Sequence, residues 1–246
     1  MISFVIPAYN EELELSATIA AIHAATSGAA QQCEVIVVDD ASTDATPKIA
    51  SRAGAKVVHI DRRQIAAARN AGAHAAQGGY LFFVDADTRI NRTHVIEAIA
   101  ALKAGCAGGS ARVALDGSIP IWGHVLLRAF GTLYFGLNLG AGAFLFTNRR
   151  NFDMVGGFDE QYFAGEEVYF SLALRKLGRF KVLREPIVTS GRKLRMYPAR
   201  QFLCNFFGVI IGGPRGVRSR AKLRLWYDGK REKELLANGT GAAGPE

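Results

Sequence analysis

The stretch YLFFVDAD at residues 80–87 and the stretch EVIVVDD at residues 34–40 share one pattern, an apolar run that ends in acidic residues. Short apolar runs of this kind are typical of strands that are buried on both faces of a parallel sheet. Ligands bind at the carboxyl ends of the strands in open α/β sheets. Both acidic pairs are therefore expected at one ligand-binding edge.

Two more apolar runs, at residues 2–7 and 56–60, predict further strands, and apolar residues recur between the runs at helical spacing. Asn10 is the predicted N-cap of the first helix, Pro47 lies near the start of the second, and the third covers residues 64–76. The β-α-β-α-β-α-β order implies an α/β fold with a Rossmann-like, mostly parallel sheet and helices on both faces.

The pattern loosens after Asp87. Helices are expected at residues 93–103, 119–137 and 166–177, and short strands at residues 110–115, 143–147, 180–183 and 187–189. This divides the chain into a first half (residues 1–87), a second half (88–191) and a C-terminal extension (192–246) with a frayed tail from residue 231.

The 246 residues are 49% apolar and 21% charged, proportions that exclude a disordered chain or a collagen-like repeat. The three Cys residues show no CxxC spacing, which excludes a disulfide scaffold and a Cys-based zinc site of standard spacing. The net charge of +8 falls in residues 192–246, which hold 12 Lys and Arg against 4 Asp and Glu. This extension is therefore expected to meet an anionic partner.

An anionic membrane surface suits the extension, because the apolar residues 202–213 precede a basic cluster at residues 215–224. A solvated charged face is the alternative, and nucleic acid is not expected because no binding motif accompanies the charge. The sequence shows no basic leader before an apolar segment and no uninterrupted apolar run of about 20 residues. The expected location is the cytoplasm, with peripheral contact to the inner face of the membrane.

Three acidic clusters suggest chemistry, each with a structural alternative. The Asp85-x-Asp87 spacing suits Mn²⁺ or Mg²⁺, which one or two carboxylates hold together with substrate phosphates. Asp40 has the acceptor oxygens that a nucleobase edge needs. For both clusters the alternative is an Asp that caps a helix.

The third cluster is the stretch GEE at residues 165–167. One of its two carboxylates is expected to face a cleft and to deprotonate an alcohol. The alternative is that both acids only favour a helix N-terminus electrostatically.

Six motifs stand in order along the chain: VIPAYNEE (5–12), VVDDASTD (37–44), ARNAG (68–72), FVDAD (83–87), GGFDE (156–160) and GEE (165–167). Together they resemble the family 2 glycosyltransferases, which have the GT-A fold, over residues 2–190. The resemblance implies inverting transfer of a sugar from a nucleoside diphosphate donor, typically a UDP-sugar, to an acceptor hydroxyl with Mn²⁺ or Mg²⁺ as cofactor. Residues 1–87 would then bind the nucleotide-sugar and residues 88–191 the acceptor, a sugar or a lipid-linked molecule.

The resemblance also implies roles for single residues. The nucleotide pocket is expected to be lined by Pro7, Tyr9, Glu11, Asp40, Arg69 and Asp85. Within this set Asp40 binds the base and Asp85 approaches the ribose or the donor sugar. Asp87, together with Asp85, holds the metal. The pair Glu166 and Glu167 supplies the catalytic base, for which Glu167 is preferred.

The sequence departs from the family pattern in three places. Glu167 stands where the second acid is usually Asp. No His follows His124, although many relatives have a metal-binding His after the acidic pair; Arg192 and Lys193 follow the last strand instead and are expected to contact phosphates. The QxxRW motif of processive synthases is absent at Gln201, which favours single transfers.

Other functions stay open at this level. A retaining transferase, or a transferase to a polyprenyl phosphate, would use the same fold, and a phosphate acceptor would need no strong base. A non-catalytic protein that binds a membrane surface or a polyanion would keep the fold but turn over no sugar nucleotide.

Overall fold

The computed structural model describes residues 1–28, 31–117, 123, 131, 139–196 and 217–218. These residues form an eight-stranded sheet with the strand order β3-β2-β1-β4-β7-β6-β8-β5. The strands are β1 (Ile2–Ala8), β2 (Cys33–Asp40), β3 (Lys56–Ile60), β4 (Tyr80–Val84), β5 (Thr88–Arg89), β6 (Gly108–Leu115), β7 (Phe144–Asn148) and β8 (Phe180–Thr189). The helices are α1 (Leu15–Thr26), α2 (Thr46–Arg52), α3 (Ile65–Ala75), α4 (Arg92–Lys103), α6 (Arg149–Val155), α7 (Glu166–Leu177) and α8 (Arg192–Met196).

The first four strands confirm the predicted parallel unit. β1 pairs in parallel with β2 and with β4, and β2 pairs in parallel with β3. The register places Ala8 opposite Asp39 and Asp40 opposite Ile60, so that β1, β2 and β3 end together. The loops that follow these strands therefore gather at one edge, where the sequence predicts a ligand.

The second half of the chain makes the sheet mixed. β7 runs antiparallel to both β4 and β6, whereas β6 and β8 run parallel. The two short strands predicted at residues 180–183 and 187–189 form the single strand β8. Pro186 lies where the register between β6 and β8 shifts, and a shift of this kind tolerates a residue that cannot donate to the ladder.

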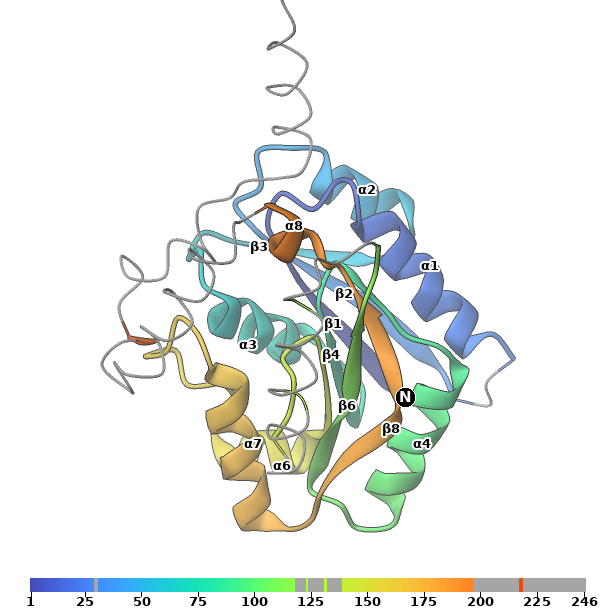
Figure 1. Cartoon of the computed structure of the whole chain (residues 1–246), viewed down its shortest axis with the longest axis vertical. Helices are drawn as coiled ribbons and strands as arrows, with labels where there is room; N and C mark the ends of the chain where they lie inside the picture. Colours follow the sequence, from blue (N-terminus) through green and yellow to red (C-terminus); the bar gives the residue numbers. More distant parts are fainter. Residues whose placement is uncertain (29–30, 118–122, 124–130, 132–138, 197–216, 219–246) are drawn as a thin grey trace, which may run out of the picture.

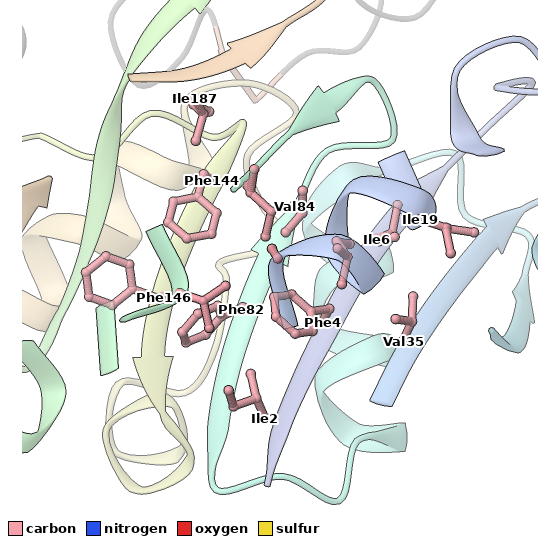
Figure 2. Close-up of a cluster of buried hydrophobic side chains, with 14 of the residues drawn as sticks. Ile2, Phe4, Ile6, Ile19, Val35, Phe82, Val84, Phe144, Phe146 and Ile187 are labelled. Atoms are coloured by element: carbon pink, nitrogen blue, oxygen red, sulfur yellow. The ribbon is translucent and has the colours of Figure 1, made fainter. Parts of the chain in front are cut away.

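Helices cover both faces of the sheet, as predicted: α1, α2 and α4 lie on one side, and α3, α6 and α7 lie on the other (Figure 1). Figure 2 shows the first core, in which the ring of Phe82 lies 5.3 Å from Phe4 and 5.9 Å from Phe144, edge-on to both. Because side chains alternate along a strand, the next residue, Phe83, packs in the second core against Phe158 and Phe170. The sheet is thus buried on both faces.

The prediction that Asn10 caps the first helix is wrong. Asn10 has a left-handed backbone, with φ of 52°, and α1 begins only at Leu15. The Asn10 Oδ1 atom accepts a hydrogen bond of 2.8 Å from the backbone N–H of Thr43. Asn10 therefore ties the loop after β1 to the loop after β2, and this long-range contact replaces the local cap.

Several predicted segments lie outside the described residues. They are the helix at residues 119–137 (apart from residues 123 and 131), the apolar stretch at 202–213, most of the basic cluster at 215–224 and the tail from 231. Membrane contact of the extension and a cytoplasmic location stay predictions. None of the helices within the described ranges is both long and apolar enough to span a membrane.

Candidate active site

Arg69 lies at the centre of the acidic residues. It projects from α3, and its side chain is only 2% exposed. Its Nη1 atom donates to Glu166 Oε1 at 2.7 Å, and its Nη2 atom donates to Asp85 Oδ1 and to the Gly142 carbonyl, both at 2.9 Å. Burial alone lowers the pKa of Arg69, but the Asp85 and Glu166 carboxylates hold it above its ordinary value. One guanidinium therefore joins the DxD stretch to the acidic pair.

Two of the carboxyl groups around Arg69 hold a proton more tightly than a free carboxyl group does. Burial raises the pKa of Asp85 to about 6, although the charge of Arg69 opposes this. Burial, and then the neighbouring Glu166 carboxylate, raise the pKa of Glu167 to about 8. A general base works best when its pKa is close to the operating pH. A carboxyl group whose pKa is raised in this way suits proton transfer near neutral pH better than an ordinary carboxyl group does.

Glu166 and Glu167 are the first two residues of α7, which follows the left-handed N-cap Gly165 with φ of 74°. Glu166 is buried against Arg69. Glu167 borders Gly142, where an added Cβ would lie 3.6 Å from Glu167 Cδ and 3.2 Å from Arg69 Nη2. Both carboxyl groups lie near Arg69, and which of the two faces an acceptor stays a prediction.

Asp40, at the end of β2, holds the loop between β3 and α3. Its Oδ1 atom accepts from the backbone N–H groups of Arg62 and Arg63 at 2.8 and 2.7 Å, and its Oδ2 atom accepts from that of Gln64 at 2.7 Å. Gln64 is the N-cap residue of α3. Neither α2 nor α3 has a side-chain hydrogen bond from its N-cap residue, so the structure does not show the capping alternative. Because a carboxylate offers about four acceptor positions, the described residues leave one of them open on Oδ2.

Tyr9 lies in the loop after β1, with the Cζ atom of Arg63 3.2 Å from the centroid of its ring. Since Arg63 also donates to Asp40, Tyr9 and Asp40 border the same place at the sheet edge. Asn10, Ala41 and Arg63 have positive φ values in the loops after β1, β2 and β3. Strained backbone of this kind in residues other than Gly clusters at ligand sites.

Arg192, the first residue of α8, joins two other predicted site residues. Its Nη1 and Nη2 atoms donate to the two carboxylate oxygens of Glu11 at 2.7 and 2.6 Å. Its Nη2 atom also lies 3.2 Å from Asp87 Oδ2. Burial alone lowers the pKa of Arg192, but the hydrogen bonds to Glu11 and the charge of Asp87 raise it well above its usual range. Arg192, the predicted phosphate contact, therefore lies beside Glu11, which is predicted to bind the nucleotide, and beside Asp87, the predicted metal ligand.

Two predicted site residues contribute less. Pro7 lies inside β1, opposite Val38 of β2, and its role in the nucleotide pocket stays a prediction. Lys193 belongs to α8, but its side chain lies outside the described part of the structure, so its phosphate contact also stays a prediction.

The acids at this edge suit a hard divalent cation that also binds substrate phosphates. No group of three or more His, Cys, Asp or Glu side chains that could hold a metal occurs among the described residues. Mn²⁺ and Mg²⁺ need only one or two carboxylates when phosphates supply further oxygens. Asp87 Oδ1 accepts from the Thr189 hydroxyl at 3.2 Å, which orients this carboxylate. Asp85 and Asp87 therefore fit the cation that the resemblance implies.

Sequence reasoning missed three residues of this site: Arg63, Gly142 and Thr189. Thr189 ends the predicted strand at residues 187–189, so its place at a strand end was a usable signal. Gly142 lies in a weakly patterned region, where one glycine among many carries no signal. The position of Arg63 depends on the contacts of its loop with Asp40, which the sequence does not show.

The family model described as Glycosyl transferase family 2 matches residues 3–158. The chain belongs to this family. The succinoglycan biosynthesis protein ExoO of Rhizobium meliloti is 27% identical to this family 2 chain over 214 residues, which cover 82% of the chain and 60% of ExoO. The putative glycosyltransferase EpsH of Bacillus subtilis is 31% identical over 91 residues, or 35% of the chain and 26% of EpsH. The chain thus spans less than two thirds of either relative.

Solved structures share the GT-A fold of this family 2 chain. One is the mannosyltransferase PcManGT of Pyrobaculum calidifontis, solved in complex with GDP-Man and Mn²⁺. It superposes on this chain with a TM-score of 0.64 at 18% sequence identity, and the superposition covers 99% of this chain and 76% of the PcManGT chain. Residues 1–349 of S. aureus TarS, solved with UDP-GlcNAc, give a TM-score of 0.62 at 21% identity over 78% of this chain and 58% of that chain. At these identities the likeness establishes the fold alone.

Proposed function

We propose that this protein is an inverting glycosyltransferase that moves a sugar, in single transfers, from a uridine diphosphate donor to an acceptor hydroxyl. One observation carries the proposal: Arg69 brings Asp85 and the Glu166–Glu167 pair to one site. Inversion needs a base on one face of the anomeric carbon and a stabilised leaving group on the other. In this proposal Glu167 provides the base, and Asp85 and Asp87 lie on the side of the leaving group.

The acceptor capacity of Asp40 supports uracil as the base. Three of its acceptor positions are taken by the backbone amides of Arg62, Arg63 and Gln64, and the one that stays open among the residues described is on Oδ2. One position suits the single imide N–H of uracil. Guanine presents two neighbouring donors, which pair best with both oxygens of a carboxylate. GDP-linked donors are therefore expected to bind less well.

The leaving diphosphate needs positive charge. Asp87 and Asp85 would hold Mn²⁺ or Mg²⁺, and the cation would stabilise the charge that develops on the diphosphate. Arg192 lies beside Asp87 and is held by both oxygens of Glu11, so that its guanidinium is fixed near the same position. Arginine suits phosphate recognition because its planar donors match pairs of phosphate oxygens.

The chemical step then follows from the pKa of Glu167. In its ionised form this carboxylate takes the proton of the acceptor hydroxyl while the hydroxyl oxygen bonds to the anomeric carbon. The bond between that carbon and the diphosphate oxygen breaks, and the nucleoside diphosphate leaves with the electron pair. Glu166 stays paired with Arg69 throughout, which keeps the two acids in different roles.

Thermal unfolding with UDP, GDP, CDP and dTDP, each with and without Mn²⁺, tests the proposal. A ligand at 100 times its Kd stabilises the folded state by about 2.7 kcal/mol, a change that is easily measured. We expect UDP with Mn²⁺ to raise the unfolding temperature most. Asp87→Asn should lose the part of this rise that depends on Mn²⁺. Asp153→Asn, an exposed control on α6, should keep it. A folded protein that no nucleotide stabilises would overturn the proposal.

A further inference from the structure

Helix α7, whose first two residues are Glu166 and Glu167, begins without a side-chain cap. Its N-cap residue, Gly165, has a left-handed backbone with φ of 74° and no side chain that could accept a hydrogen bond from the first turn. An N-cap side chain is the usual local device that holds the start of a helix. The start of α7, and with it the place of both carboxylates, is therefore held by contacts of another kind.

Tyr162 makes such a contact. Its ring stacks on the ring of Tyr169, with the centroids 3.9 Å apart and the planes at 8° to each other. Tyr169 is the fourth residue of α7, and Tyr162 precedes the helix. The pair resembles a hydrophobic staple, in which a residue before the N-cap packs on the fourth helical residue and fixes the angle at which the chain enters the helix. Here two aromatic rings form the staple.

Tyr162 is itself fixed in place, and only 7% of it is exposed. Its backbone carbonyl accepts a hydrogen bond of 3.4 Å from Nε2 of Gln64, the N-cap residue of α3. Its hydroxyl accepts one of 3.3 Å from Nη2 of Arg218. The next residue, Phe163, donates its N–H to the carbonyl of Val217 at 2.8 Å, and residues 217–218 lie beside this loop in Figure 1. Tyr162 is thus tied to α3, the helix that carries the central guanidinium of the site.

We propose that Tyr162 is a positioning residue for the acid pair: its ring fixes where α7 begins, and so where Glu166 and Glu167 meet Arg69. The contact that depends on this position is short, with 2.7 Å between Arg69 Nη1 and Glu166 Oε1. A displacement of about 1 Å at a reacting group can lower a rate by about 100-fold. The inference rests on the proposed function in so far as Glu167 is the base, but the order of α7 can be measured without a substrate.

Tyr162→Leu tests the inference, because leucine is apolar but cannot stack. Hydrogen exchange is measured for the amides of Val168 and Tyr169, which donate to the Gly165 carbonyl at 2.9 and 3.3 Å. We expect both to exchange roughly 10-fold faster than in the wild type, the factor that the loss of one stacked aromatic pair gives. Tyr162→Phe keeps the stack and loses only the bond to Arg218, so its exchange should match the wild type.

Two further variants make the comparison specific. Tyr169→Leu removes the same stack from the more exposed ring and should give the same result as Tyr162→Leu, so the test does not depend on the folding of one variant. The matched control is Tyr80→Leu. Tyr80 is a half-buried tyrosine at the start of β4, at the end of that strand away from the acids. Its loss should leave the exchange of the first turn of α7 unchanged.

Binding and turnover show whether the order of α7 matters for the reaction. The affinity of Tyr162→Leu for UDP with Mn²⁺, measured by calorimetry, should equal that of the wild type. The rate at which UDP is released from UDP-glucose or UDP-GlcNAc, with water as the acceptor, should fall roughly 100-fold. Tyr162→Phe should keep both the affinity and the rate.

Other outcomes overturn the inference. Unchanged exchange of the α7 amides in Tyr162→Leu and Tyr169→Leu, or equal acceleration in Tyr80→Leu, would show that the stack does not hold the helix. A fall in rate with an equal loss of UDP affinity would place Tyr162 in the donor site. A wild-type protein that neither binds UDP nor releases it from either probe would instead overturn the proposed function, while the exchange still decides whether Tyr162 positions α7.

Discussion

Arg69 Nη1 lies 2.7 Å from Glu166 Oε1, and the two side chains are only 2% and 5% exposed. This pair connects α3 to α7. Buried charges that lose their partner are far more costly than exposed ones, because no water replaces the lost interaction. The same contact that arranges the acids should therefore dominate the local stability.

Arg69→Met should destabilise the protein by about 3–5 kcal/mol, because it leaves the buried Glu166 carboxylate and the partly exposed Asp85 carboxylate without their cation. Urea unfolding measures the change. Arg62→Met is the matched control: it breaks an ion pair with Glu160 in which the side chains are 61% and 40% exposed. Exposed pairs contribute about 0–1 kcal/mol, so equal losses in the two variants would contradict the role of Arg69.

Glu167→Gln and Glu166→Gln should separate catalysis from structure. Loss of the general base in Glu167→Gln should lower the transfer rate by about 10²–10⁴-fold with little change in nucleotide affinity. Glu166→Gln should lower stability first, because it removes a charge partner of Arg69. Single-turnover kinetics and unfolding are the measurements. A rate that survives Glu167→Gln would favour an acceptor that is already an anion, such as a polyprenyl phosphate.

The raised pKa of Glu167 also predicts how stability changes with pH. Burial raises its pKa from the ordinary value of 4.5 to about 8, with Glu166 of α7, Arg69 of α3 and Asp85 after β4 as the charged neighbours. Between these two values the folded state holds a proton that the unfolded state releases. The contribution of Glu167 to stability therefore falls as the pH rises through this window.

The comparison of wild type with Glu167→Gln isolates this effect. The stability of the wild type relative to the variant should fall from pH 4.5 to pH 8, the two pKa values of Glu167. Over the same range kcat/KM of the wild type should rise, because only the ionised carboxylate accepts a proton. Parallel stability curves for the two proteins would show that Glu167 is not perturbed in the free enzyme.

The parallel half of the fold could be predicted because its strands are buried on both faces. A run such as residues 81–84 is continuously apolar, and its direction follows from the helices that connect it to its neighbours. β7 begins with three apolar residues, but an apolar run alone does not tell whether a strand lies parallel or antiparallel. Its direction depends on how it pairs with β4, which the sequence does not show.

The candidate site was predictable to the extent that acids and strand ends coincide. Asp40 ends β2, and Asp85 and Asp87 follow β4, at the strand ends where the sequence places them. α8 was not predicted, because the five residues from Arg192 to Met196 are too few to show helical periodicity. The place of Arg192 depends on Glu11, 181 positions earlier in the chain. No local pattern can reveal a contact of this kind.

Asn70 should prove important although it touches none of the acids around Arg69. Its Nδ2 and Oδ1 atoms bind the carbonyl and the N–H of Phe158 at 2.8 and 2.9 Å. The ring of Phe158 lies 5.2 Å from the Arg69 guanidinium, so Asn70 supports the surroundings of Arg69. Asn70→Ala should cost about 1–3 kcal/mol for each buried backbone group left unpaired. Gln161→Ala, at an exposed residue of the next loop, is the control in urea unfolding and should have little effect.

Arg192→Gln should weaken the fold and strengthen the binding of Mn²⁺ to the free protein. The Arg192 guanidinium is 11% exposed and neutralises Glu11 and Asp87, so its loss should cost about 3–5 kcal/mol. The freed Asp87 carboxylate then meets a cation without competition from Nη2. Mn²⁺ should therefore raise the unfolding temperature more in the variant than in the wild type. The matched control is Arg195→Gln, because Arg195 also belongs to α8 and forms an ion pair with an aspartate, Asp116. Equal Mn²⁺ shifts in all three proteins would show that Arg192 and the metal do not share Asp87.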